Sequence, residues 1–258
     1  MIRGLYTAWT GMYNEQKRLD VLSNNLANSA TVGFKKEGAT SQSFDEVLTI
    51  RAKNNEEPMG GGTIGTMSLG VKVGEVYTDY GQGAVRETGN PFDLALEGDG
   101  FFAIEYTDKN GAVTTRYTRA GEFNMTRDGY ITTADGQHVL GQSGVLQVPV
   151  DAAEIVIDTE GRVFADRELV DTLRLVDFEN YDFLKKFGET MYMPVKGAEE
   201  KPADVRVLQG YTEQSNVNVI KEMVDMITIT RAYEANQRVI RSLDTLIDAD
   251  VNSVGRVQ

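Results

Sequence analysis

The sequence predicts an α+β fold, in which N- and C-terminal helices form a discontinuous coiled-coil domain and an antiparallel all-β domain is inserted between them. Two observations support this prediction. Residues 1–36 and 211–258 are poor in glycine and follow helical spacing. The stretch between them is rich in glycine and acidic residues, and short β-like runs alternate there with turn signals. Long apolar stripes at both ends of a chain are more typical of a subunit that stacks with its own copies than of a globular enzyme.

The first helix is expected to end near Asn28. Four apolar residues in it, Leu5, Met12, Leu19 and Leu26, recur every seven positions, which is the spacing of a coiled-coil seam. At ~1.5 Å per residue, this helix would be about 40 Å long.

The last helix is expected to begin in residues 214–218, a cluster of good N-cap residues. Its apolar residues also recur every seven positions: Val219, Met226, Tyr233, Ile240 and Ile247. The pattern continues almost to the C-terminus without proline, and without glycine before Gly255. Pairing of the first and last helices would make one helical domain from the two ends of the chain.

Both seams are predicted to pack against copies of the chain, although packing on the chain's own core is the alternative for any amphipathic helix. The seams are long, and polar residues such as Gln16 and Thr230 interrupt them, which is typical of positions that set register and partner choice. The residues expected at this assembly interface are Leu5, Trp9, Met12, Leu19, Leu26, Val219, Met223, Met226, Tyr233, Ile240 and Ile247.

The chain is divided by this pattern into residues 1–36 with 211–258, the paired terminal helices, and residues 37–210, a β-rich outer domain. The outer domain includes an extended loop at about 42–70, which contains the Gly60-Gly61-Gly62 triplet. Turns are expected at four Gly-containing sites, and Asn-Gly and Asp-Gly pairs favour tight hairpins because they accept positive φ angles. The four sites are Lys109-Asn110-Gly111, Arg127-Asp128-Gly129, Asp135-Gly136 and Glu160-Gly161. The candidate strands are Val71–Tyr77, Ala84–Thr88, Phe101–Tyr106, Val113–Tyr117, Tyr130–Thr132, Ile155–Ile157, Val163–Ala165 and Leu169–Phe178.

Charge is distributed unevenly along the chain, whose net charge is −13. The two ends together carry 10 basic and 9 acidic side chains, and the middle carries 16 basic and 30 acidic ones. Near-neutral ends can pack densely, and an acidic middle suits a solvated surface and argues against nucleic-acid binding. The absence of cysteine excludes disulfides and thiolate zinc sites. No apolar run is long enough for direct membrane insertion, and no cleaved signal peptide is expected.

A search for catalytic chemistry finds no convincing site, so the chain is expected to be no enzyme and to need no cofactor or metal. Asp93, Glu97 and Asp99 are close enough in sequence to suggest a carboxylate pair, and a β-domain hydrolase that uses them is the competing hypothesis from a different class. His138, the single histidine, is expected to be a surface or strand residue rather than a catalytic one. An adhesin with a coiled-coil stalk is a further alternative, which would require a secretion signal or anchor.

Four separated motifs, which occur in order, resemble those of the bacterial flagellar basal-body rod protein family of the FlgG and FlgF type, related to hook and other rod proteins. They lie in residues 23–35, 88–102, 117–123 and 210–236. Ala120 stands where that family more often has aspartate. The residues that carry the resemblance are Asn24, Asn25, Leu26, Asn28, Gly33, Phe34, Gly89, Asn90, Asp93, Gly98, Gly100, Phe101, Phe102, Ser215, Asn216, Val217 and Asn218.

The resemblance implies a torque-transmitting subunit of the flagellar basal body, exported from the cytoplasm by the flagellar type III export apparatus. The terminal helices of that family line a hollow helical tube, and its β-domain lies outside them. The implied partners are copies of the chain, neighbouring rod and hook proteins, and surrounding ring proteins. The excursion Gln42–Gly70 is similar to the extra segment of the distal-rod type, and a proximal rod protein is the alternative within the family.

Overall fold

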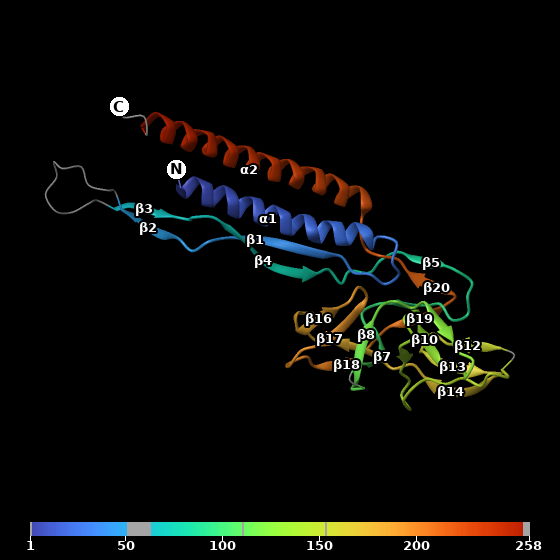
Figure 1. Ribbon diagram of the computed structural model, residues 1–258. Coiled ribbons are helices and arrows are strands. Elements are labelled where there is room, and N and C mark those ends of the chain that lie inside the picture. The colour runs from blue at the N-terminus through green and yellow to red at the C-terminus, as the bar shows by residue number, and fades with distance from the viewer. Residues whose placement is uncertain (1, 51–62, 110, 153, 255–258) are drawn as a thin grey trace. The chain divides into compact units, whose positions relative to one another are not determined.

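The computed structural model describes residues 2–50, 63–109, 111–152 and 154–254. It confirms the α+β class, with a helix at each end of the chain and antiparallel strands between them (Figure 1). The chain forms two compact units, each built from separate segments. We call the first the helical unit, which comprises Met1–Leu26, Glu37–Asp79 and Asn218–Gln258. We call the second the β unit, which comprises Ala27–Lys36 and Tyr80–Val217.

This grouping places residues 37–79 with the helices, whereas the sequence pattern assigns them to the β-rich domain that begins at residue 37. It also places residues 27–36 and 211–217 with the strands. The sequence-based boundaries at 36/37 and 210/211 therefore stay a prediction about which parts of the chain fold independently.

The helical unit is built around two antiparallel helices, α1 (Ile2–Ala27) and α2 (Val219–Val254), which lie side by side (Figure 1). A Cβ atom placed on Gly4 would lie 3.6 Å from Leu243, and one on Gly11 would lie 3.0 Å from Asn236. The contact therefore moves seven residues forward on α1 as it moves seven back on α2. At Gly11 the absence of a Cβ atom leaves room for Asn236, whereas at Gly4 a Cβ atom would make an ordinary van der Waals contact.

The ends of the helices are close to where the sequence predicts them. The backbone N–H of Lys221 donates to Oδ1 of Asn218 at 3.1 Å, so Asn218 caps α2 as expected for the residue before the first turn. The last residue of α1 is Ala27, one position before Asn28. Within the described part of the chain, no helix combines the length and the apolar character that crossing a membrane requires.

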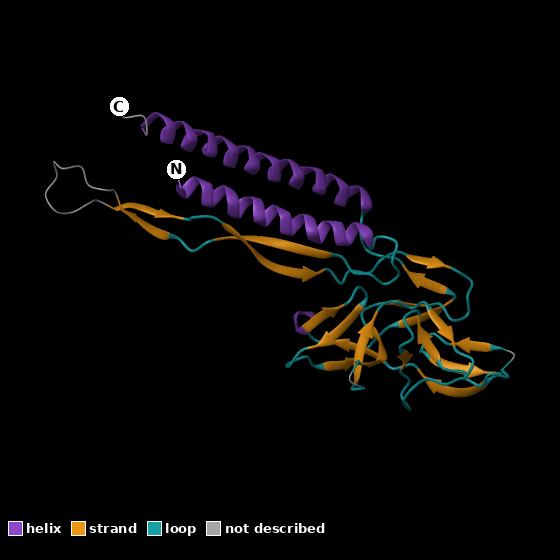
Figure 2. Cartoon of the chain, in the orientation of Figure 1, coloured by secondary structure: helices purple, strands orange, loops and turns teal. Residues whose placement is uncertain are grey.

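A long antiparallel ribbon completes the helical unit. It consists of β1 (Glu37–Ser43) paired with β4 (Val71–Thr78), and of β2 (Val47–Ile50) paired with β3 (Thr63–Met67) (Figure 2). The stretch 42–70, expected to be an extended loop, thus includes the β2–β3 pair, and its residues 51–62 lie outside the described residues. The ribbon packs on α1, where Asn14 Nδ2 donates to Ser41 Oγ at 2.9 Å.

Asn25, which is fully buried, ties the end of α1 to the start of this ribbon. Its Oδ1 accepts the backbone N–H of Glu37 at 2.9 Å, and its Nδ2 donates to the Glu37 carbonyl at 2.8 Å. Nδ2 also lies 3.3 Å from a carboxylate oxygen of Glu222 on α2, which is buried as well. One amide on α1 therefore bonds to polar groups of both β1 and α2.

We expect Asn25→Ala to lower the free energy of unfolding of the helical unit by about 2–3 kcal/mol, because two backbone groups of Glu37 and the buried Glu222 lose a hydrogen-bond partner. Urea denaturation followed by far-UV circular dichroism measures this loss. Ser23→Ala, at an exposed position of the same helix, is the control and is expected to change the stability by less than about 0.5 kcal/mol. Equal effects of the two substitutions would contradict the idea that the Asn25 hydrogen bonds hold α1, β1 and α2 together.

The β unit contains only antiparallel strand pairs among its described residues. Its principal sheet has the order β16-β17-β8-β7-β11-β10-β9, with β15 and β18 attached through β7, and three smaller sheets pair β12-β13-β14, β19-β6 and β20-β5. One 3₁₀ turn covers Tyr181–Phe183. The strands are β5 (Val85–Glu87), β6 (Leu94–Glu97), β7 (Phe101–Thr107), β8 (Val113–Thr118), β9 (Phe123–Met125), β10 (Ile131–Thr133), β11 (His138–Val139), β12 (Ile155–Ile157), β13 (Arg162–Ala165), β14 (Glu168–Thr172), β15 (Leu175–Phe178), β16 (Leu184–Phe187), β17 (Met191–Pro194), β18 (Glu200–Pro202), β19 (Arg206–Gln209) and β20 (Tyr211–Glu213).

Strand β7 is the centre of the β unit because both of its faces are buried. Side chains alternate between the faces of a strand, so Phe102 and Ile104 belong to one hydrophobic core, and Phe101 and Ala103 belong to a second. This explains why the segment reads as a continuous apolar run rather than as an alternating one.

The predicted strands are confirmed in position, with one exception. Leu169–Phe178 is two strands, β14 and β15, because the first half pairs with β13 and the second half pairs with β7 and β18. The four predicted turns are confirmed by positive φ angles at their glycines, Gly111, Gly129, Gly136 and Gly161.

Candidate functional site: a buried charge cluster

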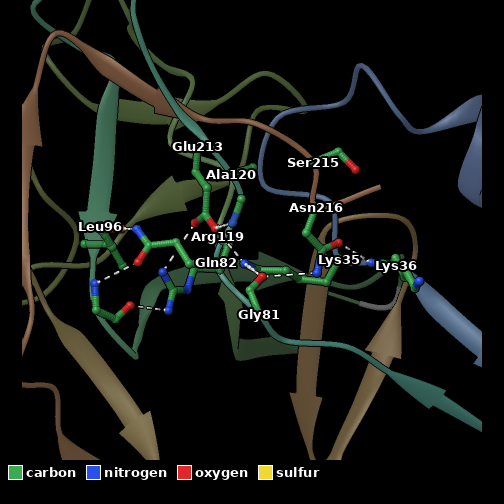
Figure 3. Close-up of polar contacts among 12 residues, drawn as sticks. Lys35, Lys36, Gly81, Gln82, Leu96, Arg119, Ala120, Glu213, Ser215 and Asn216 are labelled. Atoms are coloured by element: carbon green, nitrogen blue, oxygen red, sulfur yellow. Dashed lines mark hydrogen bonds and ion pairs between the residues drawn. The ribbon is translucent and has the colours of Figure 1, made fainter. Parts of the chain in front are cut away.

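Three charged side chains meet inside the β unit, and we call them the buried charge cluster: Lys35, Arg119 and Glu213 (Figure 3). Lys35 follows the loop that leaves α1, Arg119 follows β8, and Glu213 ends β20. Their side chains are 1%, 3% and 0% exposed. Because charges are rarely buried unless they are paired and hydrogen-bonded, this cluster is the most unusual chemistry in the described part of the chain.

Glu213 is the centre of the cluster. Its Oε1 accepts from Lys35 Nζ at 2.6 Å and from the backbone N–H of Gly83 at 2.9 Å, and its Oε2 lies 3.3 Å from Arg119 Nη1. The cations also donate to backbone carbonyls: Lys35 Nζ to Gly81 at 2.9 Å, and Arg119 Nη2 to Gly98 at 2.6 Å. One carboxylate thus faces two cations, and each cation is also stabilised by a backbone carbonyl dipole.

Backbone hydrogen bonds hold the same segments together. The N–H of Gly33 donates to the Glu213 carbonyl at 2.8 Å, and the N–H of Gln214 donates to the Ala84 carbonyl at 2.8 Å. Asn216 extends this contact, because its Oδ1 accepts the N–H of Lys36 at 2.8 Å and its Nδ2 donates to the Gly81 carbonyl at 3.1 Å (Figure 3). The segment before β5 is therefore held between the segments that enter and leave the unit.

Gly33 makes the close approach in this region. Its φ angle is +67°, and a Cβ atom there would lie 2.3 Å from the backbone nitrogen of Ala120. A side chain at residue 33 would meet backbone that has little room to shift, in a conformation that already disfavours L-residues.

An aromatic group adjoins the cluster. The Arg119 guanidinium lies 5.5 Å from the centre of the Phe101 ring, and Tyr181 packs on that ring edge to face at 5.9 Å.

Burial and a 2.6 Å hydrogen bond to the Asp177 carboxylate raise the pKa of Tyr181 well above its usual value. For Asp177 itself, burial acts to raise the pKa, but bonds from Tyr181, Lys201 and a backbone N–H together lower it. The phenol therefore stays neutral and the carboxylate stays charged near neutral pH.

The carboxylates of the hydrolase hypothesis do not share a pocket. Asp93 is buried and closes a turn, where it accepts from Thr88 Oγ1 at 2.6 Å and from Asn90 Nδ2 at 3.0 Å. Glu97 and Asp99 are exposed. A cavity of about 490 Å³ elsewhere in the unit includes Glu122, Asp135 and Glu189 in its lining but none of these three residues.

His138 lies on β11 with its ring 5.2 Å from that of Tyr130. Among the described residues, no group of three or more His, Cys, Asp or Glu side chains is placed to hold a metal ion.

The predicted assembly residues lie on the two helices and differ in how exposed their side chains are. Leu5, Met12, Leu19, Leu26, Met226, Tyr233, Ile240 and Ile247 are half-buried, and Trp9, Val219 and Met223 are exposed. The fully buried side chains on the helices include polar ones, such as Asn14, Asn25 and Glu222. The proposal that the seams contact other copies rests on the apolar surface that remains accessible in a single copy.

Comparison with known protein families adds the decisive observation. Residues 5–35 match the model described as "Flagella basal body rod protein", residues 95–165 match "Flagellar hook protein FlgE/F/G D1 domain", and residues 208–254 match "Flagellar basal body rod FlgEFG protein C-terminal".

Curated relatives match over nearly the whole chain. The flagellar basal-body rod protein FlgG of Bacillus subtilis strain 168 is 33% identical over 98% of this chain and 99% of its own length. FlgG of Agrobacterium fabrum is 35% identical over 95% of this chain and 97% of its own length, and FlgF of Rhizobium meliloti is 32% identical over 99% of each.

The chain belongs to the flagellar basal-body rod protein family. The family segments explain the cluster's composition, because each contributes one of its charges. Lys35 ends the N-terminal segment, Arg119 lies in the D1 segment, and Glu213 lies in the C-terminal segment. The cluster thus joins the three parts of the chain that carry the rod-family signature.

The other motif residues of the rod family are turn, cap and packing residues. Gly89, Gly98 and Gly100 have positive φ angles, and Phe34, Phe101 and Phe102 are fully buried. Asn28 accepts from Thr31 Oγ1 at 3.1 Å, and Ser215 Oγ accepts the N–H of Val217 at 3.3 Å. Asn24 is exposed, and Leu26 and Val217 are half-buried.

Sequence reasoning missed the pairing at the centre of the site. Lys35 and Arg119 lie within recognised motif segments, but nothing in the sequence links them to Glu213, which lies 178 residues beyond Lys35. The available signal is the position of each charge: Lys35 directly follows the apolar Val32–Phe34 segment, and Glu213 ends a short strand directly before the N-cap cluster of the last helix.

Proposed function

We propose that this chain is a structural subunit of the bacterial flagellar basal-body rod. In this proposal it assembles with its own copies through its terminal helices into a hollow helical drive shaft, which transmits motor torque to the hook. The observation that carries the proposal is the similarity to rod proteins over almost the entire chain, with each family segment joined to the others at the buried charge cluster. A shaft subunit must resist twisting, and a cluster that ties three segments together suits that load.

The helices support the assembly part of the proposal. Both are paired in the antiparallel register described above, and both keep large apolar side chains exposed: Tyr6, Trp9 and Tyr13 on α1, and Ile220 and others on α2. Exposed apolar patches of this kind mark protein interfaces. The ends of the chain are nearly neutral, so close packing of many copies of them avoids strong repulsion between like charges.

We further propose a distal position in the rod. The β2–β3 pair, which extends the ribbon β1–β4, supports this position, because the sequence excursion there is similar to the extra segment of the distal type. FlgG relatives of up to 35% identity agree with it. A proximal position is the second candidate, and it is favoured by the FlgF relative at 32% identity over 99% of the chain.

The remaining parts of the proposal concern partners and route. The chain would contact neighbouring rod and hook proteins, lie within surrounding ring proteins, and leave the cytoplasm through the flagellar type III export apparatus without cleavage. Its role would be mechanical rather than catalytic. The placement of Asp93 in a closed turn, away from the exposed Glu97 and Asp99, supports this and disfavours the hydrolase.

Complementation tests the proposal. The full chain is expressed in two strains derived from a motile bacterium. One lacks its FlgG gene and the other lacks its FlgF gene, and each strain with empty vector is the control. Restored swimming and hook-bearing basal bodies in the strain without FlgG alone would support a distal subunit. Restoration only in the strain without FlgF would assign the proximal position. Basal bodies that contain none of the chain in either strain would contradict the rod assignment.

A further inference from the structure

Two exposed apolar patches on the helical unit differ in chemistry and position. The aromatic patch on α1 comprises Tyr6, Trp9 and Tyr13, which are 62%, 52% and 47% exposed. The aliphatic patch on α2 comprises Ile220, Met223, Val224 and Ile227, which are 76%, 48%, 57% and 55% exposed. Each set has the spacing of one helix face, so each forms a continuous stripe of about two turns.

Neither patch is used in the contact between the two helices. That contact runs through Gly4 and Gly11 on α1, with Leu243 and Asn236 opposite them on α2. The ribbon covers a further side of α1, where Thr10 Oγ1 accepts the N–H of Val71 at 3.4 Å. The patches are therefore apolar faces that lie outside the helix–helix contact and remain exposed within the helical unit.

The aromatic patch is partly preorganised. The Trp9 and Tyr13 rings stack with their centres 5.8 Å apart and their planes 15° from parallel, and Lys17 Nζ lies 5.8 Å from the Tyr13 ring centre. Rigid aromatic side chains lose little conformational entropy on binding and are enriched among residues that dominate interface energies. An exposed stripe of branched aliphatic side chains is a suitable surface for them to cover.

The patches lie at different levels of the helix pair. By the antiparallel register, residues 6–13 of α1 lie level with residues 234–241 of α2, whereas the aliphatic patch occupies residues 220–227. The separation of about 14 residues corresponds to about 20 Å along the helix axis. A contact that joins one patch to the other must shift neighbouring copies by that amount.

We propose that the aromatic patch of one copy docks on the aliphatic patch of the next copy, in a head-to-tail contact that staggers the copies by about 20 Å. This inference rests on the proposed self-assembly and specifies its surfaces. The two patches are unlike, so the contact is heterologous, and a heterologous contact with an axial shift propagates as a helix rather than closing as a dimer. The second copy is the occupant because the chain itself supplies both halves, and because its nearly neutral ends can approach each other closely while the acidic middle repels.

Mixing of two patch variants tests the contact. Trp9→Glu disables the aromatic patch and Ile227→Glu disables the aliphatic one, and both keep helix-favouring residues. Full-length proteins are followed by sedimentation velocity over a range of concentrations, with helix content checked by circular dichroism. Each variant alone is expected to raise the concentration for assembly at least about tenfold. An equal mixture is expected to form one-to-one dimers that do not elongate, because each pair retains one intact contact.

Matched controls place the same charge elsewhere on exposed helix positions. Ser23→Glu lies two heptads beyond Trp9 on α1, past the end of the aromatic patch, and Ala235→Glu lies two turns beyond Ile227 on α2. Both are expected to assemble like the unchanged chain. If they lose assembly as the patch variants do, added charge rather than the patches is responsible, and the inference is overturned.

The chain contains no cysteine, so paired single-cysteine variants report the register directly. When copies point the same way, α1 of one copy runs opposite to α2 of the next, which brings Tyr13 beside Ile220 and Tyr6 beside Ile227. Oxidation of a mixture of Tyr13→Cys and Ile220→Cys should therefore cross-link well, and a mixture of Tyr13→Cys and Ile227→Cys should cross-link poorly. Equal yields would overturn the register.

The outcomes separate this inference from the function on which it rests. If the unchanged chain assembles and the patch variants also assemble, the patches are not the contact, but self-assembly stands. If each variant alone forms a dimer through its remaining intact patch, and mixing adds no further association, each patch pairs with its own kind, and the head-to-tail contact is wrong. A mixture that stays monomeric would likewise overturn the contact between unlike patches. If the unchanged chain stays monomeric at every concentration, self-assembly itself fails and the inference fails with it.

Discussion

Glu213→Gln is expected to lower the free energy of unfolding of the β unit by about 3–5 kcal/mol, because it removes the charge of the buried carboxylate that Lys35 and Arg119 share. Glutamine keeps the shape of the side chain and an oxygen for the Gly83 N–H, so the loss reports charge rather than volume. Urea denaturation followed by near-UV circular dichroism measures it, since the buried tyrosines Tyr117 and Tyr192 lie in the same unit.

Glu160→Gln provides the control within the same unit. Glu160 also pairs with a cation, Arg162 at 3.3 Å, but its side chain is 70% exposed, and pairs of this kind contribute less than about 1 kcal/mol. A small effect of both substitutions would mean that the buried charge cluster does not hold the unit together. In a double-mutant cycle, Lys35→Met combined with Glu213→Gln should cost less than the two separate losses combined, because each single substitution already removes the ion pair between Lys35 and Glu213.

Gly33→Ala is expected to lower the free energy of unfolding of the β unit by about 2–5 kcal/mol. A residue with a Cβ atom loses about 1–2 kcal/mol in a left-handed conformation, and overlap with the backbone of Ala120 adds about 1–3 kcal/mol. The measurement is the urea midpoint of the β unit. Since Gly33 also places Lys35 two residues later, the substitution should weaken the cluster as well.

Gly136→Ala separates the two contributions. Its φ angle of +86° is as unfavourable for alanine as that of Gly33, but nothing lies within 4 Å of its added Cβ atom. It is expected to cost only the conformational part, about 1–2 kcal/mol. Equal losses at the two glycines would show that the backbone at Ala120 moves aside and that the close approach carries no energetic weight.

The helices could be predicted from sequence because their signal is local and repeated. A seven-residue apolar spacing and an N-cap residue located α2 within the expected segment, with Asn218 as its cap. The turns could also be predicted, since Gly129 and Gly136 each follow an aspartate. Strand β1, in contrast, was missed because Glu37–Ser43 has one weakly apolar residue, Ala39, and its partner β4 lies some thirty residues further along the chain.

The site could not be predicted from sequence, and the reason is physical. Arg119 and Glu213 look like ordinary surface charges, because burial of a charge depends on what the rest of the chain brings around it. Glu213 becomes buried only when the Gly33–Lys35 segment lies across it, a contact that spans most of the chain. Resemblance to a family located the motif segments, but it did not show that one carboxylate joins them.

The buried charge cluster also sets when the β unit is complete during synthesis. Lys35 leaves the ribosome early, and its carboxylate partner Glu213 leaves it only after the intervening strands have been made. Until then the carboxylate that Lys35 and Arg119 share is missing from the core, so a nascent or truncated chain that ends before residue 213 is expected to keep these cations in water. The β unit is therefore expected to close only in chains that include Glu213, the last residue of its last strand.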